Sequence, residues 1–438
     1  MQFDEQNPDV IIIGGGLAGL AAAVMLARQG RSVRLFEQSH AAGGRARTKE
    51  QDGFHLNLGP HALYRSGQAN KILGELGVEP SGRVPSVSGA YAVRRGAKHT
   101  FPAGLVSMLT TSLFGLSAKL EAARLLASLS KIETSKLTGV SVSEWLDAHI
   151  ADQVVKEFLM AVFRVSTYTN APDLMSAGAA LEQLQMAFDK SVLYLDGGWQ
   201  TLVDQLSRLA TDAGVIIETG TKVDIVERDA AGAVRGVRLA DDRSFFSRTV
   251  VIASSPRVAV SLVEGGRETS LARWADEMVA VKAACLDVSL KDLPLPKVTF
   301  ALGIDRPLYL SVHSATARLA PEGGALIHVA KYLPPEHRES PDEDRRELEN
   351  LLDLVQPGWR ERVVNSRFLP DMIVMNAIAT VGLEGTKQRP SPEIRDVPGL
   401  FVAGDWVGSE GLLADASMAS AKQAAQLIAS KQKAFVAA

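Results

Sequence analysis

Three glycines near the start of the chain have the spacing of a phosphate-binding turn. Gly14, Gly16 and Gly19 lie between an apolar run over 10–13 and an Ala- and Leu-rich stretch over 20–28. In a strand–turn–helix unit, the first glycine permits the tight turn, the second lets the backbone approach a pyrophosphate, and the third lets helix and strand pack closely. The start of the following helix offers free N–H groups to the phosphates. This segment therefore predicts a dinucleotide-binding unit.

An acidic residue lies where such a unit binds a ribose. Residues 32–36 form a second strand-like run, and Glu37 ends it, about 20 residues after the last glycine of the turn. A carboxylate at this position can accept hydrogen bonds from both ribose hydroxyls of an adenosine. It also disfavours a 2′-phosphate, so we do not expect NADP at this site. Nothing else along the chain resembles a second nucleotide fingerprint.

The segment after Glu37 indicates which dinucleotide binds. Residues 43–48 read Gly-Gly-Arg-Ala-Arg-Thr, and together with the glycine turn they resemble the long motif of the two-dinucleotide-binding flavoprotein superfamily. This superfamily includes flavin amine oxidases, protoporphyrinogen oxidases and phytoene desaturases. Within it, residues 57–64 resemble the phytoene-dehydrogenase-related branch, where a Gly-Pro pair passes the flavin ring, and the resemblance recurs at 401–406 and 411–416. It implies FAD as the cofactor. Because Cys285 is the one cysteine, we expect no thioether link and a non-covalent FAD.

The resemblance implies FAD contacts from both ends of the chain. Asp405 would contact the ribityl–phosphate part, and Val223 would contact the adenine through its backbone. A helix that starts near Leu412 would direct its N-terminus at the pyrimidine edge of the flavin, where a dipole stabilises the negative charge of the reduced ring. The expected cofactor-binding residues are Gly14, Gly16, Leu17, Ala18, Gly19, Glu37, Gly44, Arg45, Gly59, Pro60, His61, Ala62, Val223, Gly404, Asp405, Leu412 and Leu413.

Candidate catalytic residues are few, because a flavin itself performs hydride or electron transfer. His61 falls beside the expected ring position and is a candidate to move a proton or orient the substrate, with a structural hydrogen bond to the backbone as the alternative. Tyr168 closes a polar helical end that we expect to line the pocket, with pairing of Arg164 to a carboxylate as the alternative. Lys331 is similar in place to the lysine that many amine oxidases hold near the flavin. The residues around it do not match, so we do not expect it there.

Composition excludes several other classes of protein. The chain has 438 residues, enough for roughly two or three domains. The 47 Lys and Arg against 50 Asp and Glu give a net charge of −3, with no basic excess for nucleic acid. The eight histidines form no HExxH pair or cluster, so no metal site is predicted. A lone cysteine suits a reducing compartment, and the start of the chain lacks the basic residues of a secretory signal, so we expect a cytoplasmic location.

Two stretches, 10–27 and 101–118, each run 18 residues without a charge, about the length of a membrane span. The strand–turn–helix unit explains the first. The second is diluted by Gly, Pro, Ser and Thr, and we expect it to be buried or to line a pocket. Peripheral membrane contact is the alternative.

The elements that must position these residues predict an α/β fold. We expect helices over 117–131, 141–149, 152–162, 199–213 and 412–431, and strands over 215–218, 222–227, 234–239 and 244–253. Together with the motifs, they predict a Rossmann-like FAD-binding domain of the glutathione-reductase type, formed by 1–75, 193–282 and 385–438. A mixed α+β substrate-binding domain, formed by 76–192 and 283–384, would be inserted into it.

The resemblance implies an FAD-dependent oxidoreductase. The uncharged and helical insert favours a largely apolar small molecule as substrate, oxidised at a C–H bond as in a desaturase or dehydrogenase. Electrons would pass to oxygen, a quinone or another acceptor, which the sequence does not identify. One alternative is a flavin amine oxidase, and another is a flavin-binding module without turnover.

Overall fold

The computed structural model describes residues 7–436, and one half of it is built on a five-stranded parallel sheet. In sheet order the strands are β10 (Ile216–Thr219), β2 (Val33–Glu37), β1 (Val10–Ile13), β14 (Val250–Ile252) and β20 (Leu400–Val402). Four of the five strands are buried along their whole length, as expected for a parallel sheet with both faces covered.

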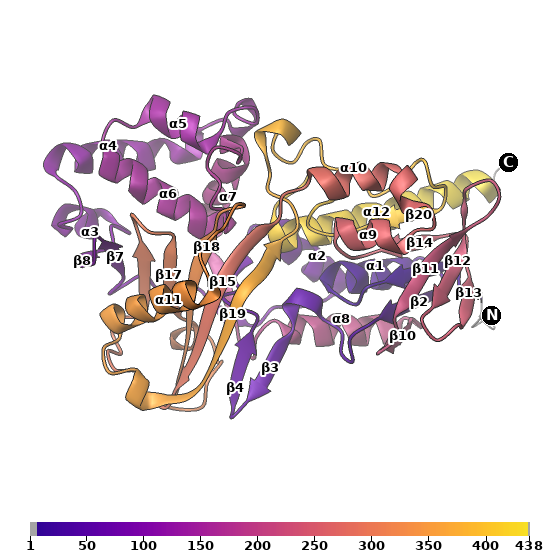
Figure 1. Ribbon diagram of the computed structural model, residues 1–438, viewed down its shortest axis with the longest axis horizontal. Coiled ribbons are helices and arrows are strands. Elements are labelled where there is room, and N and C mark those ends of the chain that lie inside the picture. The colour runs from indigo at the N-terminus through magenta and orange to yellow at the C-terminus, as the bar shows by residue number, and fades with distance from the viewer. Residues whose placement is uncertain (1–6, 437–438) are drawn as a thin grey trace.

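Helices cover one face of this sheet, and a second small sheet covers the other (Figure 1). The first layer consists of α1 (Leu17–Arg28), α2 (Gln68–Leu76), α8 (Gln200–Asp212) and α12 (Leu413–Val436). The second consists of β11 (Val223–Arg228), β12 (Val234–Leu239), β13 (Ser244–Phe246), α9 (Pro256–Leu262) and α10 (Ser270–Glu277).

The single strand predicted over 244–253 is wrong. It is two strands, β13 and β14, in different sheets. Between them the Ser247 hydroxyl contacts the carbonyl oxygens of Asp9 and Thr249 and accepts a hydrogen bond from the Thr249 N–H. These contacts turn the chain from one sheet into the other.

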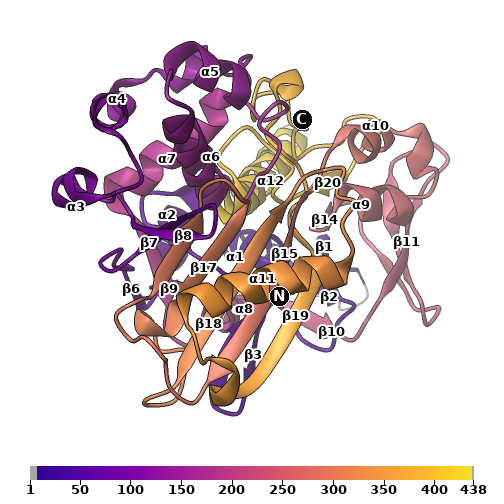
Figure 2. The ribbon, with the colours of Figure 1, turned by 60° about the vertical axis from the view of Figure 1, so that its left-hand side comes forward.

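A seven-stranded sheet forms the other half of the structure. Its order is β19 (Val363–Met375), β15 (Val281–Leu290), β18 (Ala325–Leu333), β17 (Leu308–Val312), β16 (Phe300–Gly303), β7 (Tyr91–Arg94) and β8 (Ala97–Thr100). It thus joins strands from two distant parts of the chain. The helix α11 (Pro341–Val355) lies across one face of this sheet (Figure 2). The domain limits stay a prediction; β15 begins at Val281 and crosses the predicted limit after residue 282.

A helical lobe packs on the same sheet. It contains α3 (Leu105–Thr110), α4 (Leu116–Ser128), α5 (Val142–His149), α6 (Gln153–Thr167) and α7 (Ala177–Lys190). The predicted helices are confirmed here, although α6 runs to Thr167 rather than 162. Ser141 and Asp152 cap the starts of α5 and α6 with side-chain hydrogen bonds. Residues 101–118 are only partly buried, contrary to expectation, because Leu105, Val106 and Leu109 are exposed.

Short strands connect the two halves. They are β3 (Thr48–Gln51) paired with β4 (Phe54–Asn57), and β9 (Val192–Leu195) paired with both β5 (Leu63–Tyr64) and β6 (Gly82–Arg83). Among residues 7–436, no helix has both the length and the apolar character needed to cross a membrane.

Candidate functional site

The glycine turn joins β1 to α1 and is closed by backbone contacts. Gly14 has a φ of +110°, and a Cβ there would lie 2.5 Å from the carbonyl oxygen of Ala253. A Cβ on Gly19 would overlap the carbonyl oxygen of Gly14. Only glycine fits at these two positions.

The middle glycine of the turn faces open space instead. The atom nearest to a Cβ on Gly16 would be the carbonyl oxygen of Gly43, 4.0 Å away. Gly16 is also the N-cap of α1, and no side chain caps the first turn, which contains Leu17 and Ala18. The uncapped N–H groups and the open space form a cradle in which an anionic group can approach the backbone.

Glu37 is anchored to this turn. Its Oε2 accepts a hydrogen bond from the Gly15 N–H (2.7 Å), and its Oε1 accepts one from the Ser39 N–H (2.8 Å). A carboxylate can accept about four hydrogen bonds, so positions remain for ribose hydroxyls. Val223, at the start of β11, packs its side chain into the core, and its backbone contact with adenine stays a prediction.

Asp405 follows β20 and is tied to the segment after the glycine turn. Its Oδ2 accepts hydrogen bonds from Arg45 Nη1 (2.6 Å) and from the Asn376 N–H (3.1 Å), and its Oδ1 accepts one from Asn376 Nδ2 (2.8 Å). Burial alone would raise the pKa of Asp405, but Arg45 and Asn376 more than offset it and hold the pKa below its usual value. Asp405 is therefore a carboxylate at neutral pH. No motif marked Asn376 in the sequence.

The loop from Gly59 to Ala62 is pressed against the seven-stranded sheet. Gly59 has a φ of +74°, and a Cβ there would lie 3.0 Å from Cys285 Sγ and 2.9 Å from Met372 Cε. These side chains come from β15 and β19, so the sheet fixes how closely the loop approaches. Glycine is the residue that this approach permits.

His61, in this loop, is held by two backbone carbonyl groups. Its Nδ1 lies 3.1 Å from the Gly59 oxygen, and its Nε2 lies 3.1 Å from the Arg45 oxygen. Burial lowers the pKa of His61, and a neutral imidazole has one N–H for these two acceptors. These contacts support the alternative that His61 makes structural hydrogen bonds to the backbone, whereas a role for His61 in proton transfer stays a prediction.

Tyr168 reaches the same loop from the helical lobe. It ends α6 with a φ of +60°, which is uncommon for a bulky residue. Its hydroxyl donates a hydrogen bond to the carbonyl oxygen of Pro60 (2.9 Å), and burial raises its pKa well above the usual value. Tyr168 is therefore a neutral phenol that contacts the loop, and its catalytic role stays a prediction.

Arg164 does not pair with a carboxylate among the described residues, so that alternative is wrong. Its Nε donates to Asn170 Oδ1 (2.9 Å), and its buried Nη1 has no hydrogen-bond partner. Burial lowers the pKa of Arg164 to about 10.

A buried arginine lies near the start of α12. Arg389 is 6% exposed, and its Nη1 donates to the carbonyl oxygen of Gly411 (3.1 Å). Its Nε and Nη2 are buried without a partner. Burial lowers the pKa of Arg389 to about 10, and Asp405 offsets only part of this effect. No motif in the sequence marks Arg389, because no pattern distinguishes it from a surface arginine.

The start of α12 is strained. The helix begins at Leu413, one residue later than expected, and Leu413 has a φ of +55°. Its N–H points at Met375 Sδ (3.4 Å), and the neighbouring Leu412 is buried. Gly404 is joined to the same helix, because its N–H donates to Ser420 Oγ (2.9 Å). Such strain persists where the surrounding structure enforces it, often at ligand sites.

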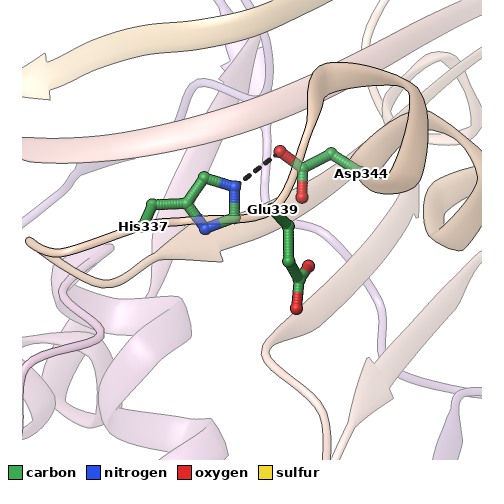
Figure 3. A group of neighbouring side chains, drawn as sticks. All are labelled: His337, Glu339 and Asp344. Atoms are coloured by element: carbon green, nitrogen blue, oxygen red, sulfur yellow. Dashed lines mark hydrogen bonds and ion pairs between the residues drawn. The ribbon is translucent and has the colours of Figure 1, made fainter.

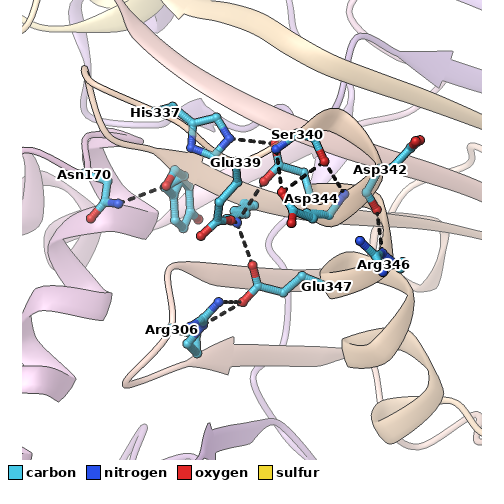
Figure 4. Close-up of polar contacts among 12 residues, drawn as sticks. Asn170, Arg306, His337, Glu339, Ser340, Asp342, Asp344, Arg346 and Glu347 are labelled. Atoms are coloured by element: carbon cyan, nitrogen blue, oxygen red, sulfur yellow. Dashed lines mark hydrogen bonds and ion pairs between the residues drawn. The ribbon is translucent and has the colours of Figure 1, made fainter.

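Lys331 does not join the contacts of the predicted site residues, as expected. Its ammonium group contacts carboxylates of Glu339, Asp344 (2.8 Å) and Glu347 (2.7 Å) on the side of α11. Figure 4 labels these three acidic residues, which lie close together. The next residue, Tyr332, points to the other face of the sheet, where its ring meets that of Tyr168.

One group of side chains beside α11 has ligand atoms within 4.8 Å of one another. It consists of His337, Glu339 and Asp344, with His337 Nε2 2.7 Å from Asp344 Oδ2 (Figure 3). The ammonium group of Lys331 already pairs with both carboxylates. We therefore place no metal ion there.

Several of the predicted site residues, from Glu37 to His61, form one continuous line of contacts. Glu37 accepts a hydrogen bond from the glycine turn. Gly44 lies against Gly16, since a Cβ added to Gly44 would be 3.6 Å from the Cα of Gly16. Arg45 then joins Asp405 through its side chain and His61 through its carbonyl group. The line has a carboxylate at the ribose end and an uncapped helix start in the middle. Near Asp405 lies a buried cation, Arg389, with two nitrogen atoms that have no partner. This donor and acceptor set fits an elongated, anionic flavin dinucleotide.

Comparisons with known proteins identify the family of this chain. The model of the family "Flavin containing amine oxidoreductase" matches residues 17–429. The 4,4′-diaponeurosporene oxygenase of Staphylococcus aureus (strain bovine RF122 / ET3-1) is 24% identical over 56% of this chain and 55% of its own. Protoporphyrinogen oxidase 2 of Arabidopsis thaliana is 29% identical over 38% of this chain and 34% of its own. The match thus spans about half, or less, of these curated relatives.

Solved structures show the same fold. An oxidoreductase from Methanosarcina mazei superimposes with a TM-score of 0.76 at 19% identity, over 94% of this chain and 98% of its own. Putrescine oxidase superimposes with a TM-score of 0.73 at 16% identity, over 97% and 99%. The mixed α/β fold is therefore that of amine-oxidase-type flavoproteins. Since the family model covers nearly the whole chain, this protein belongs to the flavin-containing amine oxidoreductases and is a flavin-dependent oxidoreductase.

Proposed function

We propose that this protein binds FAD non-covalently and oxidises a C–H bond of a largely apolar small molecule, with oxygen, a quinone or another compound as electron acceptor. The observation that carries the proposal is the continuous line of contacts from Glu37 to His61. This line joins residues that, according to the FAD motif, bind opposite ends of one dinucleotide. The FAD-binding domain would then be of the Rossmann-like, glutathione-reductase type.

Each part of this line has a distinct role toward the cofactor. Glu37 would accept the ribose hydroxyls, and the start of α1 would bind the phosphates. Asp405 would accept a hydroxyl of the ribityl chain, with Arg45 and Asn376 keeping it ionised. The start of α12, with Arg389 behind it, would place positive potential beside the pyrimidine edge. When bound, the flavin supplies the group that accepts a hydride or electrons.

The surroundings of the Gly59–Ala62 loop favour an apolar substrate. Tyr332 and Leu412 are buried in one hydrophobic cluster beside it, and Tyr168 and Met372 pack against that cluster. Two curated relatives are named for a carotenoid and a porphyrinogen, which supports an apolar substrate here. Cys285 is buried and burial raises its pKa well above the usual value, so it offers no thiolate for a flavin link.

The alternatives have less support. A flavin amine oxidase shares the fold, but Lys331 is held by three carboxylates on the far face of β18 and cannot serve as the lysine of that chemistry. A module without turnover is not proposed, because the family consists of oxidoreductases. A cytoplasmic location stays a prediction from the sequence.

Two measurements test the proposal. The absorption spectrum of the purified protein, before and after acid release, should show one FAD per chain that is released without proteolysis. Anaerobic mixing with a panel of carotenoids, porphyrinogens and amines should bleach the flavin with one of the apolar compounds. Bleaching by amines alone would establish the amine oxidase instead, and a protein that takes up no FAD would overturn the proposed site.

A further inference from the structure

A buried carboxylate in the seven-stranded sheet has a partner on each neighbouring strand. Asp287 on β15 is fully buried, and its register partners are His328 on β18 and Arg367 on β19. Its Oδ1 lies 2.5 Å from His328 Nδ1, and its Oδ2 accepts hydrogen bonds from Arg367 Nη2 (2.5 Å) and Nε (3.2 Å). We name these three residues the Asp287 triad. The line of contacts from Glu37 to His61 does not include them.

The two partners keep Asp287 charged. Burial alone would raise the pKa of Asp287, but His328 and Arg367 more than offset it and hold the pKa below its usual value. Because a carboxylate only accepts hydrogen bonds, His328 Nδ1 carries the proton that lies between the two side chains. The triad therefore contains a carboxylate and a guanidinium group in a buried place. Such an ion pair often stabilises a fold no better than apolar side chains of similar size, so strand packing alone does not account for it.

The triad reaches the loop that follows β4. Arg367 Nη2 also donates a hydrogen bond to the carbonyl oxygen of Asn57. Asn57 is the last residue of β4, two residues before Gly59. Arg367 thus holds the carbonyl group at the start of the loop, as the Tyr168 hydroxyl holds that of Pro60. Through this contact the triad and the Gly59–Ala62 loop are joined.

The charges of the triad also act on the loop. Burial is the main cause that lowers the pKa of His61, and the charges of His328 and Asp287 act on the same pKa with opposite signs. His313 lies edge-on to His328, with 4.6 Å between the ring centroids, and burial lowers its pKa well below the usual value. His313 is therefore neutral at neutral pH. Buried charges are screened less than exposed ones, so a change of charge in the triad should be felt at the loop.

We propose that Asp287 and Arg367 are positioning residues that set the midpoint potential of the bound flavin. Arg367 would hold the start of the loop that faces the flavin ring, and the two opposite charges would set the electrostatic potential at the ring. This inference rests on the proposed FAD site, because it requires the ring to lie beside the Gly59–Ala62 loop. The alternative is a triad that only joins the three strands, in which case its charges have no effect on the flavin.

The test is the midpoint potential of the FAD-loaded protein, measured against reference dyes without any substrate. Arg367→Gln removes a positive charge but keeps an N–H donor, and it should lower the potential, because the reduced ring carries negative charge. Asp287→Asn removes a negative charge at equal size and should raise the potential. In each variant the ratio of the affinities for reduced and oxidised FAD should change at least about threefold, in opposite directions. Loosened packing would move both potentials in the same direction.

Two further variants complete the test. Arg367→Lys keeps the charge and should keep the potential of the wild type, so the pair Arg367→Gln and Arg367→Lys decides the question even if Asp287→Asn does not fold. A matched control is the exposed ion pair of Lys282 and Asp371 on the same two strands, β15 and β19. Lys282→Met and Asp371→Asn should leave the potential unchanged.

The outcomes separate this inference from the proposed function. Wild-type potentials in Arg367→Gln and Asp287→Asn, or shifts of equal sign in the two variants, overturn the inference and leave the FAD site in place. An equal shift in Arg367→Gln and Arg367→Lys also overturns it, because the charge would then not matter. A wild type that takes up no FAD overturns the proposed function, and this inference with it.

Discussion

Lys331 and Arg389 are both buried cations, but their surroundings differ in one respect. Lys331 has three carboxylates around its ammonium group. Arg389 has one carbonyl oxygen and two nitrogen atoms without a partner. Hydrogen bonds from Lys331 to Asp344, Glu339 and Glu347 outweigh burial and raise the pKa of the lysine, whereas burial lowers that of Arg389. The protein itself thus supplies the anionic partners of the lysine, whereas two nitrogen atoms of the arginine have no partner among the described residues.

Among the proposed substitutions, we expect the largest effect when Lys331 is replaced. Lys331→Met leaves the buried carboxylate of Asp344 without its cation, and we expect the free energy of unfolding to fall by about 3–5 kcal/mol. Urea denaturation would measure the loss, and FAD affinity should stay unchanged. The control is Lys282→Met, which breaks an exposed pair with Asp371 and should cost at most about 1 kcal/mol. Equal losses in the two variants would contradict the difference.

A buried carboxyl group in the first turn of α12 predicts a dependence on pH. Burial raises the pKa of Asp415 to about 6, against an ordinary value of about 4 in the unfolded chain. The raised pKa stabilises the fold fully below about pH 4, and this contribution is lost as pH rises through 6. Relative to Asp415→Asn, the wild type should therefore lose about 3 kcal/mol between these limits. Parallel stability curves for the two proteins would refute the shift.

Removing Arg389 should lower FAD affinity and leave stability intact, whereas removing Lys331 should lower stability and leave FAD affinity intact. Arg389→Met takes away a desolvated cation, so the FAD-free protein should be as stable as the wild type or more so. Its FAD affinity should fall by about 1.5–3 kcal/mol, the size of a charged hydrogen bond. Arg389→Lys should restore part of this affinity. Calorimetric titration with FAD, next to denaturation of the FAD-free protein, separates the two effects.

The smallest expected effect concerns the other end of the line of contacts. Glu37→Ala removes the proposed ribose partner and should weaken FAD binding by about 1–3 kcal/mol. Glu37→Gln is the matched variant, because its amide oxygen can still accept a hydrogen bond from Gly15 or a ribose hydroxyl. An unchanged FAD content in Glu37→Ala would place the adenosine elsewhere.

The sequence predicts local geometry well and distant contacts poorly. The glycine turn, its flanking strands and most helices follow from glycine spacing and apolar runs, which act over short stretches of chain. The contacts of Tyr168 with Pro60 and of Asn376 with Asp405 join residues that no local pattern links. Arg389 looks ordinary in sequence, since burial and lack of a partner arise only in the folded protein.

The uncharged stretch 101–118 shows the same limit. Its apolar residues suggested burial, but composition does not tell which face of a helix has a neighbour. Met108 is buried, whereas Leu105 and Leu109 on the same helix are exposed. Peripheral membrane contact, an alternative at the sequence level, stays a prediction.

The position of β20 in the parallel sheet has a consequence for biosynthesis. β1 lies in the middle of that sheet and β20 at its edge beside β14, yet they are translated far apart in time. Until residue 402 leaves the ribosome, β14 has an unpaired side, a feature that promotes wrong pairing with other chains. We therefore expect the growing chain to need protection by chaperones. We also expect that FAD cannot bind before α12 has left the ribosome.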